Sequence, residues 1–326
     1  MNFFEKIRPQ PPSENESRES NPSEVITGDE LLNMDIDNYP TLLDPVFPKV
    51  GLIALAGSSD TGKSSFLRQF AIHVSSGMDN FLGFNLDLKH QSAIVFSTED
   101  DKTAISFLLN KQNERLNFPP EAFNNLRYVF EAMDPVAELN RELNKKPADV
   151  VIIDTFTDIY RGEMNATNRI RCFLNDYSQL AQQHETLFIF LHHTGKGKDK
   201  LEPSKHNLLG SQGFEAKMRL VMELRKDQFN PDYRHLCVVK GNYLAEEFKN
   251  KSFLLEFDKH MLFHNRHERV PFENLVQYES SERKNHKEEN LTKTKELLER
   301  GFNQSQIAQE LGVNKGTVSR YIKEIP

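Results

Sequence analysis

Residues 57–64 read Gly57-Ser58-Ser59-Asp60-Thr61-Gly62-Lys63-Ser64, which fits every fixed position of the phosphate-binding pattern G-x-x-x-x-G-K-[ST]. The apolar run 50–56 before it suits a buried strand, and the segment 65–74 after it has helical periodicity. A strand, a glycine-bearing loop and a helix N-terminus bring backbone N–H groups and the positive end of a helix dipole to one phosphate. The alternative is a chance Gly/Ser turn before a helix. The stretch therefore predicts binding of a nucleoside triphosphate.

Each part of this loop has an expected task. Lys63 should reach the β- and γ-phosphates, and the Ser64 hydroxyl should ligate Mg²⁺. ATP and Mg²⁺ are therefore the expected cofactors. The residues predicted to surround them are Gly57, Ser58, Ser59, Asp60, Thr61, Gly62, Lys63, Ser64 and Ser65.

Length and composition limit the classes of protein to consider. The chain has 326 residues, 37% of them hydrophobic, which is enough for one sizeable core and a small second module. Its net charge of −7 argues against general binding of polyanions, so any contact with DNA must come from local clusters. Cys172 and Cys237 are the only cysteines and form no disulfide framework. Without an apolar run of roughly 20 residues or a signal-peptide segment, a cytoplasmic protein without membrane contact is expected.

The chain divides by composition into four parts. Residues 1–24 should be a disordered tail, because they offer little to bury. Residues 25–264 alternate apolar runs with helical stretches, which predicts a mainly parallel α/β sheet with an antiparallel extension. Polar residues 265–289 suggest a linker, and 290–326 a small helical module. The strands are expected at 51–56, 92–97, 149–154, 186–191, 218–224, 235–240 and 252–257.

Two later apolar runs end in carboxylates. Asp154 has the position of a Walker B aspartate, which holds Mg²⁺ through water. The alternative is an aspartate that only caps a junction between a strand and a loop. Glu99 follows the run 93–98 and is the candidate general base, because a carboxylate beside the phosphate-loop strand can polarise the attacking water. The alternative is that Glu99, Asp100 and Asp101 only begin the next helix, where acids favour the dipole.

Two adjacent histidines, His192 and His193, end the apolar run 187–191. One of them is predicted to face the γ-phosphate and to report its loss. A zinc pair is the alternative, but adjacent strand residues point to opposite faces and chelate one metal poorly.

The segment 195–206, directly after the histidines, is glycine-rich and basic. It is predicted to be mobile and to grip a nucleic-acid backbone in response to the nucleotide state, with a solvated surface loop as the alternative. Residues 161–169 form a second candidate channel loop. The lysines expected to contact DNA are Lys196, Lys198, Lys200 and Lys205.

Taken together, these motifs resemble RecA-fold ATPases, most closely the RepA-type replicative helicases of plasmids and mobile elements, the AAA_25 group. The resemblance covers about residues 35–260 and implies a homo-oligomeric ring, usually a hexamer, around single-stranded DNA. Its matching pieces are 57–64, 97–100, 153–154, 162–165, 192–197 and 209–219.

The resemblance also implies roles for single residues. Glu99 matches the catalytic glutamate of the family, and Lys240 matches the lysine that a subunit inserts toward its neighbour's nucleotide. Related hexameric helicases often have an arginine two residues later, where this chain has Asn242. Arg219 is the other candidate for that positive charge.

Residues 290–326 have the pattern helix, glycine stop, helix, glycine turn, helix. The segment resembles the small trihelical DNA-binding modules of resolvases and regulators, so a helix-turn-helix that binds duplex DNA is expected. A three-helix protein-interaction module is the alternative. The predicted DNA contacts are Lys315, Thr317, Arg320 and Lys323.

Two functions of different classes remain open at this point. The first is an ATP-driven DNA motor or ring ATPase of a mobile element, such as a replicative helicase recruited by its own helix-turn-helix. The second is a DNA-bound initiator or regulator that ATP switches between assembly states without strand separation.

Overall fold

The computed structural model describes residues 25–34, 36–210, 212–276 and 280–325. The chain divides into two compact units, residues 1–39 and 40–326, and each is described by itself. The predicted disordered tail, 1–24, lies outside the described residues.

The described part of the first unit contains one short helix, α1 (Gly28–Leu32). A capping box begins it, in which the side chains of Thr27 and Glu30 each bond the other's backbone N–H. Leu31 and Leu32 are 54% and 84% exposed. The second unit begins at Pro40, whereas the sequence analysis places the start of the α/β domain at residue 25.

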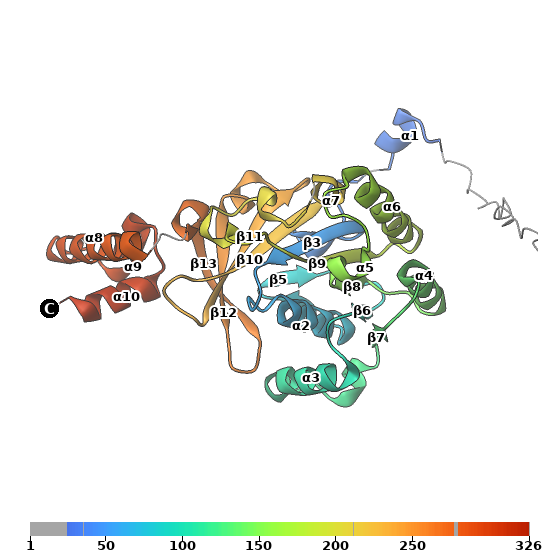
Figure 1. Ribbon diagram of the computed structural model, residues 1–326, viewed down its shortest axis with the longest axis horizontal. Coiled ribbons are helices and arrows are strands. Elements are labelled where there is room, and N and C mark those ends of the chain that lie inside the picture. The colour runs from blue at the N-terminus through green and yellow to red at the C-terminus, as the bar shows by residue number, and fades with distance from the viewer. Residues whose placement is uncertain (1–24, 35, 211, 277–279, 326) are drawn as a thin grey trace, which may run out of the picture. The chain divides into compact units, whose positions relative to one another are not determined.

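The second unit is built on a nine-stranded sheet in the order β13-β12-β11-β10-β3-β9-β8-β6-β7 (Figure 1). The strands from β10 to β7 are parallel, and β11, β12 and β13 extend the sheet in antiparallel fashion. This arrangement confirms the predicted fold class. The strands are β3 (Gly51–Gly57), β6 (Ala93–Ser97), β7 (Leu126–Phe130), β8 (Val150–Asp154), β9 (Leu187–His193), β10 (Leu220–Lys226), β11 (Tyr233–Gly241), β12 (Lys251–Phe257) and β13 (Phe263–Pro271).

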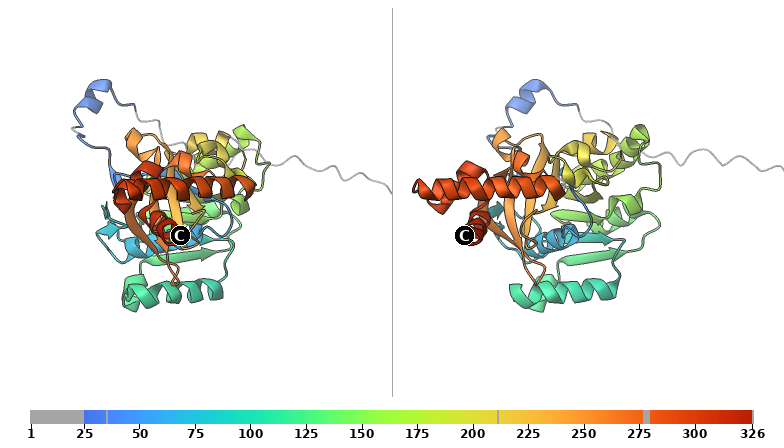
Figure 2. Two further views of the ribbon diagram at one scale, coloured as in Figure 1. Left: turned by 90° about the vertical axis from the view of Figure 1, so that its left-hand side faces the viewer. Right: turned by 60° about the vertical axis from the view of Figure 1, so that its left-hand side comes forward.

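Helices cover both faces of this sheet (Figures 1 and 2). On one face, α2 (Lys63–Ser75) and α3 (Lys102–Leu116) pack over the alternate strand residues Ile53 and Leu55. On the other face, Leu52 and Ala54 share a second core with the remaining helices of the sheet. These are α4 (Pro135–Lys145), α5 (Phe156–Ile159), α6 (Thr167–Gln183) and α7 (Gln212–Lys217).

The sequence analysis did not predict a small four-stranded sheet, β2-β1-β5-β4, which joins the core on the α2 face. Its strands are too short to give a clear period-2 pattern. They are β1 (Thr41–Asp44), β2 (Phe47–Pro48), β4 (Asn80–Phe81) and β5 (Phe84–Leu86). Short 3₁₀ turns connect other elements, at η1 (Pro120–Phe123), η2 (Lys198–Lys200), η3 (Lys205–Asn207), η4 (Glu246–Phe248) and η5 (Phe272–Leu275).

Two regular elements, a strand and a helix, occupy much of the segment 265–289 that is predicted to be a linker. Its first part belongs to the edge strand β13, and its last part belongs to helix α8 (Ser280–Glu299). β13 is polar because it has only one neighbouring strand, yet Arg269 still lies over the Phe253 ring, 4.0 Å from its centroid. Polarity alone therefore does not separate a linker from an exposed edge strand.

Three helices follow, α8, α9 (Gln304–Leu311) and α10 (Lys315–Glu324). Asn303 and Asn314 cap the second and third helices, and Gly312 ends α9 with φ 62°. A small core holds the three together, made of Leu297, Ile307, Ala308 and Val318. DNA binding by this module stays a prediction. Within the described ranges, no helix has both the length and the apolar character to cross a membrane.

The turn between β12 and β13 is fastened to α2, the helix that follows the phosphate loop. The buried Gln69 amide donates to the Phe263 backbone oxygen (3.1 Å) and accepts from its N–H (2.7 Å). Gln112 of α3 donates to the backbone oxygens of Ser65 (3.0 Å) and Met261 (2.8 Å). The outer hairpin of the sheet thereby supports the loop helix.

Gln69→Leu should lower the free energy of unfolding by about 2 kcal/mol, because it leaves a buried backbone N–H and C=O without partners. Urea unfolding followed by circular dichroism measures the change. Gln182→Leu, on the exposed side of α6, is the control and should keep the wild-type midpoint. Equal midpoints for both variants would contradict the role given to Gln69.

Candidate nucleotide-binding site

The phosphate loop lies between β3 and α2 and depends on two glycines. A Cβ at Gly57 would stand 2.5 Å from the backbone oxygen of Leu224 in β10, and Gly62 has φ 93°, so neither position suits a side chain. The Thr61 hydroxyl donates to the Ser58 oxygen (3.0 Å) inside the loop. Arg234 of β11 donates from Nε to the Thr61 oxygen (3.0 Å) and braces the loop from outside.

Lys63, the first residue of α2, lies against the loop itself, where its Nζ donates to the Ser58 oxygen (2.9 Å). Burial lowers the pKa of Lys63, and the nearby carboxylates of Asp154, Glu99 and Asp60 oppose that shift. The ammonium group therefore faces the acids predicted to share the site.

Asp154 ends β8 beside the loop and fits the role of a Mg²⁺ partner. Burial raises its pKa to about 6, although a hydrogen bond from Ser64 opposes the shift. Its Oδ1 is buried and has no hydrogen-bond partner. A buried carboxylate oxygen without a partner is costly, and a hard divalent cation would satisfy it. Ser64 and Asp154 are thus the residues that would hold Mg²⁺, together with phosphate oxygens.

The three acids after β6 have different surroundings. Asp101 caps α3 by accepting from the Ala104 N–H (2.8 Å), as the helix-start alternative expects. Glu99 is half exposed, and its Oε1 lies 3.8 Å from Nε2 of His193. Asp101 therefore has the helix-start role, and Glu99 is the acid that faces the end of β9.

Thr98 and Arg68 belong to this region, and the sequence analysis assigns a role to neither of them. The Thr98 hydroxyl donates to the Asp158 carboxylate (2.6 Å) and accepts from the Thr155 N–H (3.0 Å), which ties the ends of β6 and β8 together. Arg68 of α2 is only 5% exposed, lies 3.9 Å from Asp100 and has an unpartnered Nη1. Its one sequence signal is a charge inside an otherwise apolar helix segment.

The two histidines of β9 point to opposite faces. His193 lies on the α2 face beside Glu99, and burial lowers its pKa. His192 is fully buried on the other face, where its Nε2 contacts the Leu209 oxygen (2.7 Å) and its ring packs on Phe214 of α7, 4.5 Å between centroids. Burial lowers the pKa of His192 to about 4, so its ring is neutral at pH 7. Only His193 therefore has a side chain beside the candidate base.

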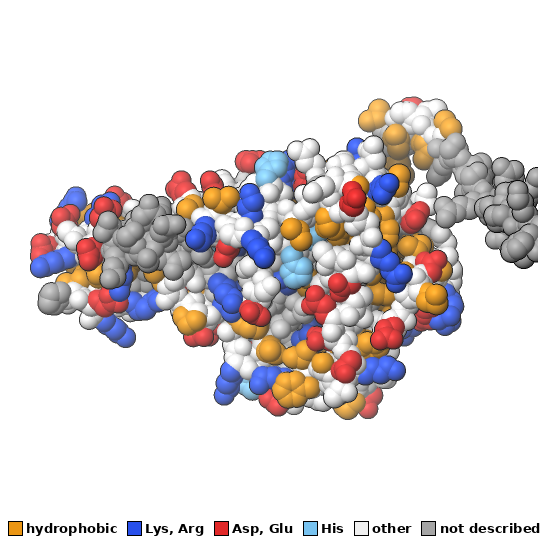
Figure 3. Space-filling model, in the orientation of Figure 1, with side chains coloured by type: hydrophobic (Ala, Val, Ile, Leu, Met, Phe, Trp, Pro, Cys, Tyr) orange, Lys and Arg blue, Asp and Glu red, His pale blue; other side chains and the backbone are white. Residues whose placement is uncertain are grey.

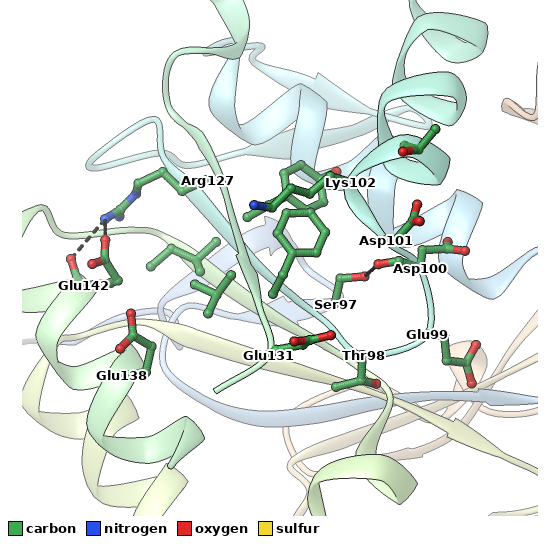
Figure 4. Close-up of a pocket in the computed structure, with 15 residues that line it drawn as sticks. Ser97, Thr98, Glu99, Asp100, Asp101, Lys102, Arg127, Glu131, Glu138 and Glu142 are labelled. Atoms are coloured by element: carbon green, nitrogen blue, oxygen red, sulfur yellow. Dashed lines mark hydrogen bonds and ion pairs between the residues drawn. The ribbon is translucent and has the colours of Figure 1, made fainter. Parts of the chain in front are cut away.

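A groove of about 1080 Å³ begins at Thr98, Glu99 and Asp100 and continues along β7 to α4 (Figure 4). Acidic side chains outnumber basic ones along it, since Glu131, Glu138 and Glu142 also line it. Arg127 contacts the Glu142 carboxylate at its far end (3.8 Å). The phosphate loop does not line this groove, so the groove lies next to the nucleotide site and is not part of that site.

The basic segment 195–206 is anchored to the sheet, and its mobility stays a prediction. Its anchor is a buried ion pair on β10, in which Arg225 Nη2 lies 2.8 Å from Glu223 Oε1. Arg225 donates to the backbone oxygens of Leu201 and Lys198, and Glu223 accepts from the Ser204 N–H (3.3 Å). Lys196 and Lys200 remain exposed on this anchored loop, whereas Lys198 and Lys205 are partly buried.

The two candidate finger residues do not join the phosphate loop of their own subunit. In the sheet, Lys240 pairs with Val221, which pairs with Ala54, well before the loop end of β3. Arg219 lies at the opposite end of β3, where its N–H donates to the Leu52 oxygen (2.8 Å) and its Nη1 to the Tyr243 hydroxyl (3.0 Å).

In the C-terminal module, Lys315 and Lys323 of α10 are exposed. Thr317 is 1% exposed, and its backbone N–H (2.8 Å) and hydroxyl (3.2 Å) both donate to Oδ1 of Asn314, the residue that caps α10, so Thr317 faces the inside of the module. Arg320 donates to the backbone oxygen of Phe229. On the face that Figure 3 draws, basic and acidic side chains are interspersed, which agrees with the negative net charge.

The fold and this site define a P-loop ATPase with the RecA-type sheet. The chain belongs to the AAA_25 family, described as an AAA domain, whose sequence profile matches residues 16–199. A solved structure titled "ATPase Domain of G40P" is similar, with 14% sequence identity and a TM-score of 0.54 over 73% of this chain and 95% of that one. No curated protein matches the chain.

Asp154→Asn should raise the free energy of unfolding of the nucleotide-free protein at pH 7, by up to about 3 kcal/mol. Burial raises the folded-state pKa of Asp154 to about 6, above its unfolded value, so the folded state binds more protons between those values. The stability that Asp154 contributes therefore falls as the pH rises through that window.

The difference in free energy of unfolding between the variant and the wild type should grow between about pH 4 and pH 6 and stay constant at higher pH. Urea unfolding at several pH values measures it, with the exposed Asp79→Asn as control. A gap that is independent of pH would contradict the raised pKa.

Proposed function

We propose that this chain is an ATP-hydrolysing, DNA-binding ring ATPase of the cytoplasm and serves as a replicative helicase of a plasmid or mobile element. The observation that carries the proposal is the meeting of Lys63, Asp154 and Glu99 at the ends of neighbouring parallel strands. Acidic, basic and metal-binding groups in one such place are the parts that phosphoryl transfer to water requires.

In this proposal Glu99 orients the attacking water and accepts its proton, because it is the exposed carboxylate beside His193. Lys63 stabilises negative charge on the phosphates, and His193 contacts the region that changes when the γ-phosphate leaves. Bound Mg²⁺, held by Ser64 and Asp154, would supply charge neutralisation.

A ring is supported because neither candidate finger residue lies at the phosphate loop of its own subunit. Lys240 and Arg219 lie away from their own phosphate loop, so either can reach a nucleotide only in another subunit. A positive charge supplied in this way is worth roughly 10³–10⁵ in rate in well-studied phosphoryl-transfer enzymes. We propose Lys240 as that group, with a hexamer as the assembly.

Contact with single-stranded DNA is assigned to the anchored loop, through Lys196, Lys198, Lys200 and Lys205. The loop follows β9 directly, so it is joined to the strand that carries His193. Duplex DNA is assigned to the C-terminal module as a helix-turn-helix, through Lys315, Lys323 and Arg320, while Thr317 supports the helix from inside.

Glu99→Gln should lower the ATP turnover number by about 10²–10⁴-fold with little change in ATP affinity, since it removes the base and not the phosphate contacts. A phosphate-release assay and a fluorescent-ATP titration measure the two quantities. Asp101→Asn removes the same charge nearby but keeps the α3 cap, and it should turn over normally. Loss of ATP binding in Glu99→Gln would show that the residue is misassigned.

A strand-displacement assay separates the helicase from the ATP-switched initiator or regulator. With ATP, the protein should release the labelled strand of a forked duplex, and the Glu99→Gln variant should not. ATP hydrolysis without strand release at any protein concentration or salt would contradict the helicase and support the regulator.

A further inference from the structure

One carboxylate contacts two of the functional lysines at once. Oε1 of Glu215, in α7, lies 3.1 Å from Lys240 Nζ and 3.5 Å from Lys205 Nζ. Lys240 comes from β11, and Lys205 from η3 in the basic loop. The carboxylate is 15% exposed and the Lys240 side chain 17%, so this group is partly withdrawn from water.

Both lysines are brought to Glu215 by ordered backbone. The loop that carries Lys205 is anchored by the buried Glu223–Arg225 pair. Lys240 sits in a paired strand, and its Nζ also donates to the backbone oxygen of Glu215 (2.7 Å). The three-residue cluster is therefore a product of the fold and not of two flexible side chains meeting at the surface.

Charge balance makes the two contacts compete. Both ammonium groups approach the same oxygen, so they repel each other, and one negative charge cannot compensate two positive ones. When one lysine leaves for another anion, the remaining lysine is held more tightly. By thermodynamic reciprocity, the binding of Lys205 to another anion strengthens the contact of Lys240 with Glu215 by the same free energy as the reverse exchange strengthens that of Lys205.

We propose that Glu215 is a shared counter-ion that makes the engagements of Lys205 and Lys240 alternate. This inference rests on the proposed function, which supplies the two outside anions, a phosphate of single-stranded DNA for Lys205 and a neighbour's nucleotide for Lys240. A subunit that grips DNA through Lys205 keeps Lys240 on Glu215. A subunit whose Lys240 reaches its neighbour keeps Lys205 off the DNA.

The cluster also has a physical connection to the nucleotide site. Glu215 follows Phe214, whose ring packs on His192, and His192 contacts the Leu209 oxygen before α7 begins. His192 is followed in β9 by His193, which faces Glu99. A shift at the end of β9 therefore reaches α7 through packed side chains.

The test measures how fast an amine-reactive reagent modifies Lys205 and Lys240, read by mass spectrometry on the full-length protein without nucleotide or DNA. Lys205→Gln should slow the labelling of Lys240, and Lys240→Gln should slow that of Lys205, each by about two- to fivefold, the range that a partly exposed ion pair supports. Glu215→Gln should speed the labelling of both. Glu202→Gln, which removes an exposed charge from the same loop, is the control and should change neither.

Two results would overturn the inference. One is that each lysine labels at its wild-type rate when the other is replaced, and the second is that Glu202→Gln reproduces the effect of Glu215→Gln. The two lysine variants measure the coupling even if Glu215→Gln does not fold.

A single-stranded oligonucleotide separates this inference from the proposed function. It should protect Lys205 from the reagent and also slow the labelling of Lys240. If the oligonucleotide leaves Lys205 unprotected while the two lysine variants still affect each other, the DNA role of the loop fails and the shared counter-ion stands. Glu215→Gln should bind the oligonucleotide about two- to fivefold more tightly, and the gain should vanish in a Lys205→Gln background.

Discussion

The close approach of β10 to the phosphate loop is the constraint on which the rest of the site depends. The Leu224 oxygen leaves no room for a Cβ at Gly57, so the loop turns where two parallel strands meet. The same strand, β10, carries Glu223 and Arg225, which hold the basic loop. One strand thereby positions both the nucleotide-binding loop and the proposed DNA-binding loop. A displacement of β10 would therefore move both loops.

The period of two along β9 divides the site between the two faces of the sheet. His193 joins the acids and Lys63 on the α2 face, while His192 packs into the core beneath α7. Because the ring of His192 is neutral and buried, its contact with α7 is one of packing and not of charge. A strand such as β9 can contact a nucleotide with the side chains on one face and a helix with those on the other, although no single residue contacts both.

Local sequence determines how much of this could be predicted. The long apolar strands and the residues of the phosphate loop carry their own signal, so the parallel sheet and the meeting of Lys63 with Asp154 follow from pattern alone. β13 has no such signal, because its residues are chosen for an edge and not for a core. Glu215 and Thr98 lie in segments that resemble the family, but no local pattern gives either of them a role, since their importance comes from partners far away in sequence. Contacts of this type are set by tertiary structure and become visible only when the chain is folded.

The balance of charge around the phosphate loop explains why such a subunit would need a neighbour. Among the described residues near the loop, three buried cations differ in what they contact. Lys63 lies against the loop, Arg68 lies by Asp100, and Arg234 donates its Nε to the Thr61 backbone oxygen. A triphosphate neutralised by Mg²⁺ and one lysine would still be negatively charged, and that charge shifts toward the leaving-group oxygen as the breaking bond lengthens. Under the proposed function the missing charge comes from a neighbouring subunit, and the fold holds Lys240 on Glu215 at a distance from its own site. The carboxylate of Glu215 holds Lys240 there, and the same carboxylate also contacts Lys205.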